Sequence, residues 1–146
     1  MVIVKASKAS EAGEMPPLEM FEAMDKFNNE LIKAGILLVG GGLTPSSQGA
    51  RVRFSGSNRT VIDGPFAETK ELIAGFMIWK VSSLQEAIDW VKKCPNPTNE
   101  DSEIEIRPLM VPEDFAGLVT PERLEEVKAL EAQSGDRDGY GLARFK

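Results

Sequence analysis

The segment 73–81 constrains the fold of this 146-residue chain more than any other feature. In an extended strand, Phe76 and Ile78 would point to one side of the sheet. Met77 and Trp79 would point to the other side. A strand that is apolar on both sides is typical of the middle of a sheet, where both faces are covered. The chain is therefore expected to fold around a sheet that contains this strand.

Periodic apolar residues before and after this segment of the chain predict two helices. The first is expected over 18–34 and ends at Gly35, a common residue at helix C-termini. Its apolar stripe consists of Leu18, Phe21, Met24, Phe27 and Leu31. The second follows a capping-box pattern at Ser83 and Glu86 and ends before Pro95. A polar loop is expected ahead of the first helix.

Short apolar or alternating segments predict the other strands. Single strands are expected at 2–4, 36–39 and 104–107, and a hairpin at 50–62 that turns at Ser55–Asn58. The order is strand, helix, strand, hairpin, strand, helix, strand. It predicts an α+β fold of ferredoxin-like type, with two helices on one face of a mainly antiparallel sheet. The apolar second face favours a partner, so we expect a homodimer.

The last part of the chain is expected to be an extension rather than part of the sheet domain. We place the domain at 1–117 and the extension at 118–146. A narrow apolar stripe predicts a helix over 121–133. Residues 134–146 are rich in glycine and charge without periodicity, and they predict a flexible tail.

Composition excludes several kinds of chemistry. The chain has no histidine, so it cannot use Ser-His-Asp or Cys-His catalysis or bind a metal through imidazole. The single cysteine, Cys94, excludes an internal disulfide and a multi-cysteine metal site, and its place at a helix end makes it a poor nucleophile. A net charge of −6 disfavours direct binding of nucleic acid. We expect no metal and no cofactor.

The chain shows no secretory signal and no apolar run long enough to cross a membrane. An unpaired thiol suits a reducing compartment. The sequence therefore predicts a cytoplasmic protein with no membrane partner.

Two arginines on the predicted hairpin form a candidate binding pair. Arg51 and Arg53 are two residues apart, so they share one face of their strand. Two guanidinium groups in this arrangement can grip a carboxylate or a phosphate. The alternative is a solvated edge strand whose charges prevent pairing with another sheet.

The segment after the hairpin carries the sharpest local pattern. Asp63 ends a strand and is followed by a Gly-Pro turn, an aromatic residue and several charges. In the structural interpretation, Asp63 caps the turn through an Asx-type bond. In the functional interpretation it is a carboxylate that faces a cleft between sheet and helix, near Arg51 or Arg53. Glu68 or Lys70 would then shift its pKa or contact the ligand.

The run DGPFAETKE at 63–71 resembles the signature of the DGPF group of YCII-related proteins. Further matching segments lie at 34–38, 42–45, 49–53, 87–91, 104–108 and 113–115. The resemblance covers about residues 1–117 in order.

The resemblance implies a dimeric α/β barrel of ferredoxin-like fold in which two copies pair face to face. It also implies a bacterial cytoplasmic protein, and some relatives are encoded beside, or fused to, extracytoplasmic-function sigma factors. In the wider family, hydrolase or lyase-type chemistry is linked to a His–Asp pair in a cleft. This chain keeps the aspartate as Asp63 and has no histidine, so that mechanism is out of its reach.

We therefore expect a small homodimeric protein that binds a small molecule or a partner protein, with a regulatory link to sigma factors implied by the resemblance. The alternative is a hydrolase- or lyase-like enzyme in which Asp63 acts as acid or base. A third possibility is a purely structural or interaction protein. The candidate ligand-binding residues are Asp63, Glu68, Lys70, Arg51 and Arg53.

Overall fold

The computed structural model describes residues 1–133 except 68–70, 99 and 116. The chain divides into two compact units, Met1–Arg107 and Pro108–Lys146. The first unit contains the sheet, the hairpin and three helices, and the second contains the C-terminal helix.

A four-stranded antiparallel sheet forms the centre of the first unit. Its strands are β1 (Val2–Lys5), β2 (Leu37–Gly42), β5 (Ile73–Trp79) and β6 (Ile104–Ile106). They lie in the order β2-β5-β1-β6, and each neighbouring pair is antiparallel. The prediction of an α+β fold with a mainly antiparallel sheet is confirmed, and this order is compatible with the ferredoxin-like type.

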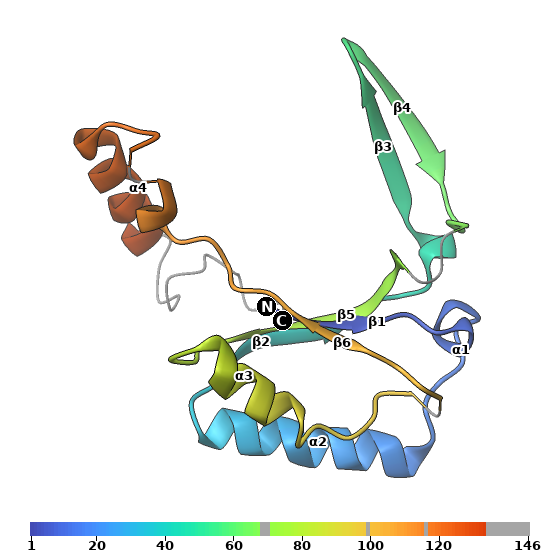
Figure 1. Cartoon of the computed structure of the whole chain (residues 1–146). Helices are drawn as coiled ribbons and strands as arrows, with labels where there is room; N and C mark the ends of the chain where they lie inside the picture. Colours follow the sequence, from blue (N-terminus) through green and yellow to red (C-terminus); the bar gives the residue numbers. More distant parts are fainter. Residues whose placement is uncertain (68–70, 99, 116, 134–146) are drawn as a thin grey trace. The chain divides into compact units, whose positions relative to one another are not determined.

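Two helices cover one face of this sheet, α2 (Leu18–Lys33) and α3 (Leu84–Val91), as Figure 1 shows. The core lies between them and the sheet and consists of Val2, Phe27, Leu31, Ile36, Met77, Trp79 and Ala87. Because side chains alternate along a strand, Phe76 and Ile78 lie on the opposite face of β5. The inner position of β5 and its two apolar faces agree with the sequence pattern.

Helix α2 follows the predicted boundaries, but only part of its apolar stripe is buried. It ends at Lys33, and Gly35 then adopts a φ of +70°, which residues with a Cβ rarely adopt. Phe27 and Leu31 are buried, and the Phe27 ring lies 6.2 Å from that of Trp79. Leu18 and Phe21 are exposed, so the stripe is buried only in the half of the helix that packs on the sheet.

The N-terminus of α3 shows half of the predicted capping box. The Ser83 hydroxyl accepts a hydrogen bond from the Glu86 amide at 3.1 Å, as expected. The Glu86 carboxylate, however, accepts from the amide and hydroxyl of Ser82, at 2.7 and 2.6 Å, and not from the backbone of Ser83. These bonds from Ser82 hold the pKa of Glu86 below its ordinary value.

The residues before α2 contain a short helix, α1 (Lys8–Glu11), where a loop was expected. Ser7 and Ser10 form a reciprocal capping box that satisfies its first backbone donors. This helix lies in the middle of the segment between β1 and α2 and carries Glu11 at its end.

The predicted hairpin is confirmed as a separate two-stranded sheet, β3 (Ala50–Ser55) and β4 (Asn58–Asp63). Figure 1 shows it rising on the side of the four-stranded sheet opposite to α2 and α3. Its strands pair in a regular register in which Val52 lies opposite Val61.

The second unit contains a short 3-10 helix, η3 (Pro112–Phe115), and α4 (Pro121–Gln133), which has the predicted boundaries. Lys128 of α4 lies 3.3 Å from a carboxylate oxygen of Glu113 and 3.1 Å from one of Glu125. The predicted flexible tail at 134–146 lies outside the described residues. No helix in the described part of the chain is long and apolar enough to cross a membrane.

Candidate functional site

The base of the hairpin is tied to the loop that follows β2. This loop contains a 3-10 turn, η1 (Ser46–Gln48). The Gly64 amide donates a hydrogen bond to the Gly49 carbonyl at 3.0 Å. A Cβ atom at position 64 would lie 1.8 Å from the Ser46 carbonyl oxygen. The glycine of the Asp-Gly-Pro-Phe turn is therefore required by a close backbone approach.

Ser46 joins three segments of the chain at this point. Its hydroxyl accepts a hydrogen bond from the Phe66 amide at 3.1 Å. Its own amide donates to the Glu11 carboxylate, at 3.2 and 3.3 Å to the two oxygens. Its hydroxyl also donates to Glu11 Oε2. Helix α1, the η1 loop and the turn after β4 are thus connected through one serine.

A hollow of about 370 Å³ lies beside this junction. It is lined by Arg51, Val52, Arg53, Ile62, Pro65, Phe66 and Ala67. The centre of the Arg51 guanidinium lies 3.9 Å from the centroid of the Phe66 ring, which is a cation–π contact. The hollow thus combines two cationic side chains with the apolar surface of the turn.

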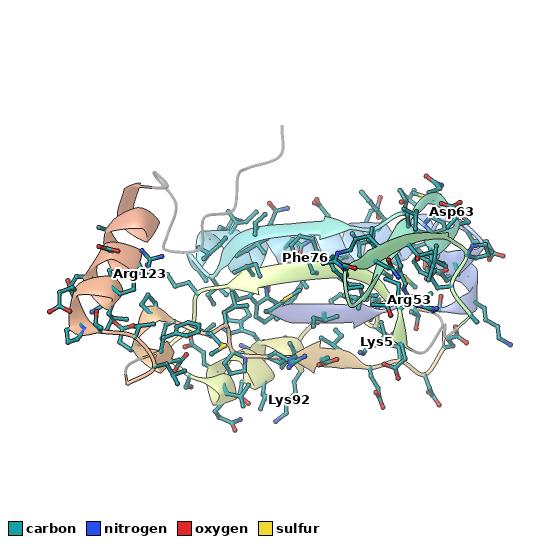
Figure 2. All side chains as sticks on the ribbon, turned by 90° about the horizontal axis from the view of Figure 1, so that it is seen from above. Lys5, Arg53, Asp63, Phe76, Lys92 and Arg123 are labelled. Carbon is teal, nitrogen blue, oxygen red and sulfur yellow. The ribbon has the colours of Figure 1, made fainter. Side chains whose placement is uncertain are left out.

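The two arginines of the candidate site are brought together as the sequence predicted. Arg51 pairs with Ile62 and Arg53 with Thr60 across the hairpin, so both guanidinium groups belong to one face. Both side chains are exposed, and both line the hollow. Figure 2 labels Arg53 on the hairpin.

Asp63 is placed differently from the arginines. It is the last residue of β4, it is exposed, and it pairs with Ala50, so it belongs to the opposite face of the hairpin. It is not among the residues that line the hollow. Within residues 1–67, no backbone amide donates to its carboxylate in an Asx-type bond. A role for Asp63 in binding stays a prediction, and its proposed neighbours Glu68 and Lys70 lie outside the described residues.

Sequence reasoning missed Glu11 and Ser46. The Ser7–Ser10 pattern is a local signal that could have indicated helix α1. The contact between Glu11 and Ser46 joins residues 35 positions apart, and no local pattern reports such a pair.

Cys94 is unsuited to nucleophilic chemistry, as expected, although the cause differs. Burial raises the pKa of its thiol to about 11, so the thiol stays protonated at neutral pH. Cys94 lies just beyond α3, and its sulfur contacts that of Met24 at 4.0 Å. Among the described residues, no group of three or more Cys, Asp or Glu side chains is placed to hold a metal ion.

Comparison with known proteins covers the part of the chain that forms the sheet and the hairpin. A family model described as the YCII-related domain matches residues 1–112. The chain therefore belongs to the YCII-related family, as the resemblance indicated. It is similar to an uncharacterized protein of Rhizobium meliloti (strain 1021), with 38% identity over 78 residues. That match covers 53% of this chain and 63% of the relative, which is less than two thirds of the relative's length.

Proposed function

We propose that this YCII-related protein is a homodimer that binds a small carboxylate-bearing molecule in the hollow at the base of its hairpin. The observation that carries this proposal is that Arg51 and Arg53 lie on one face of the hairpin, beside the Phe66 ring. The regulatory link to sigma factors, which the resemblance implies, is compatible with a ligand-binding dimer.

The chemistry of the hollow favours a planar anion. Guanidinium groups bind carboxylates through paired, charge-assisted hydrogen bonds. Arg51 is held against Phe66, which reduces the number of orientations that its long side chain can adopt. Ile62, Pro65 and Phe66 supply apolar surface for the body of the ligand. The volume of about 370 Å³ lies within the range of small-molecule sites.

Benzoate tests this proposal, with benzamide as its neutral isostere. We expect benzoate to shift NMR signals of Arg51, Arg53 and Phe66 in a saturable way, and benzamide to bind at least about tenfold more weakly, because charge-assisted hydrogen bonds are about twice as strong as neutral ones. Arg51→Gln should weaken benzoate binding by about tenfold for the same reason. Equal affinity for the two compounds would contradict the proposal.

Two variants serve as controls for the benzoate experiment. Arg59 pairs with Phe54 and belongs to the other face of the hairpin, so Arg59→Gln removes the same charge outside the hollow and should leave binding within about twofold. The acid–base alternative requires Asp63 beside the bound molecule. We expect Asp63→Asn to bind benzoate no more weakly than the wild type, because the change removes a negative charge. A large loss of benzoate affinity in Asp63→Asn would instead indicate that Asp63 is part of the binding site.

The proposed dimer rests on apolar side chains that a single chain leaves exposed. On the face of the hairpin opposite to Arg51, Phe54 is 70% exposed and Val61 is 64% exposed. Adjacent apolar residues of this kind are typical of an interaction surface. Phe76 lies half-buried on the face of the sheet opposite to α2 and α3, the side on which the hairpin rises (Figure 1), whereas Ile78 on the same face is already buried within one chain.

We expect light scattering at micromolar concentration to give twice the 16.0 kDa of one chain. Val61→Lys should shift the mass toward that of one chain, because it places a charge on the apolar face of the hairpin. Thr60→Lys, one residue away on the other face, should leave the mass unchanged. A mass of one chain for the wild type would refute the dimer.

A further inference from the structure

We propose that Glu11 and Ser46 are positioning residues that set the Phe66 ring, and through it the Arg51 guanidinium, for the ligand of the hollow. The ligand part of this inference rests on the proposed function. The positioning part rests on the hydrogen bonds among the three segments that meet at Ser46.

The first step concerns the direction of the Ser46 hydroxyl. An ionised carboxylate can only accept hydrogen bonds, so both the amide and the hydroxyl of Ser46 donate to Glu11. The single proton of the hydroxyl is then committed to Glu11. Its lone pairs remain available, and the Phe66 amide donates to them at 3.1 Å. Glu11 therefore makes Ser46 an acceptor for Phe66.

The second step leads from Phe66 to the hollow. The bond to Ser46 fixes the backbone of Phe66, whose half-buried side chain lies in the wall of the hollow. The Arg51 guanidinium lies 3.9 Å from the centroid of this ring. An exposed arginine samples many rotamers, and a fixed aromatic surface restricts them. Movement of Phe66 would release that restriction.

The third step concerns what Glu11 and Ser46 do not touch. Neither residue is among those that line the hollow, and both are half-buried in the junction. They are therefore placed to act on a ligand only through Phe66 and Arg51. Without this pair, the turn after β4 would retain the backbone bond from Gly64 to Gly49 as its tie to the η1 loop, among the described contacts.

The experiment measures amide hydrogen exchange at Phe66 and benzoate binding in the same variants of the full chain. Ser46→Ala removes the acceptor, so exchange at Phe66 should accelerate by at least about tenfold and benzoate should bind about three- to tenfold more weakly. Glu11→Gln should act in the same direction. The glutamine side chain has an NH2 group that can donate to the Ser46 hydroxyl, whereas the carboxylate can only accept. The proton of the hydroxyl is then no longer committed to residue 11.

Two further variants separate positioning from general loss of structure. Ser46→Thr keeps the hydroxyl and should retain slow exchange at Phe66 and wild-type binding within about twofold. Ser82→Ala removes a comparable serine, whose amide and hydroxyl also donate to a glutamate, Glu86. That variant should change neither the hydrogen exchange at Phe66 nor the affinity for benzoate.

Unchanged exchange at Phe66 in both Ser46→Ala and Glu11→Gln would overturn the positioning role. Faster exchange with unchanged benzoate affinity would overturn its link to the ligand. If the wild type bound no benzoate, the proposed function would fail, while the exchange rates at the Phe66 amide would still decide the positioning role. Should Ser46→Ala fail to fold, Glu11→Gln decides the same question.

Discussion

Replacing Leu31 with alanine is expected to lower the free energy of unfolding by about 3 to 4 kcal/mol. Leu31 has no exposed surface and lies in the core between α2 and the sheet, beside Phe27 and Trp79. The loss combines the transfer free energy of the removed methyl groups with the cost of the cavity that remains. Urea denaturation at a fixed chain concentration measures it, since the stability of the proposed dimer would depend on concentration.

The neighbouring residue provides the matched control for this substitution. Ile32 lies on the same helix but is 57% exposed. Ile32→Ala should therefore cost less than about 1 kcal/mol. Similar losses in the two variants would contradict the arrangement of α2 on the sheet.

Replacing Gly64 with alanine is expected to disrupt the base of the hairpin. The new Cβ would lie 1.8 Å from the carbonyl oxygen and 2.6 Å from the carbonyl carbon of Ser46. Both atoms belong to the backbone, so the turn and the η1 loop must separate. We expect a loss of about 2 to 3 kcal/mol at this junction. Faster hydrogen exchange at the Phe66 amide, which donates to Ser46, measures the local part of that loss.

Gly41→Ala is the control for a glycine that has room for a side chain. No atom outside its neighbours lies within 4 Å of a Cβ at Gly41, in the exposed part of β2. Alanine is also the better residue in a regular strand, because it loses less backbone freedom on folding. We expect Gly41→Ala to cause no loss of stability and to leave the Phe66 exchange unchanged. A similar effect of both substitutions would show that the contact at Gly64 is not the cause.

Much of the fold could be predicted because it depends on periodicity along short segments. The two apolar faces of β5 indicated an inner strand, and the sheet has it between β1 and β2. Alternation along the hairpin also indicated that Arg51 and Arg53 share a face. The prediction for α2 was only half right about burial. A stripe indicates which side of a helix is apolar, and the extent of the sheet decides how much of that side is covered.

The sequence by itself determined the order along the chain of the strands and of the two helices that cover the sheet, the hairpin, and the placement of the two arginines on one face of it. These features follow from neighbours in the chain, whose side chains alternate with a fixed period. Only the tertiary structure decided that Glu11 contacts Ser46, that Ser46 accepts from Phe66, and that Gly64 has no room for a side chain. These contacts join α1, the η1 loop and the turn after β4. They form only when folding brings distant segments together, and no local period encodes them.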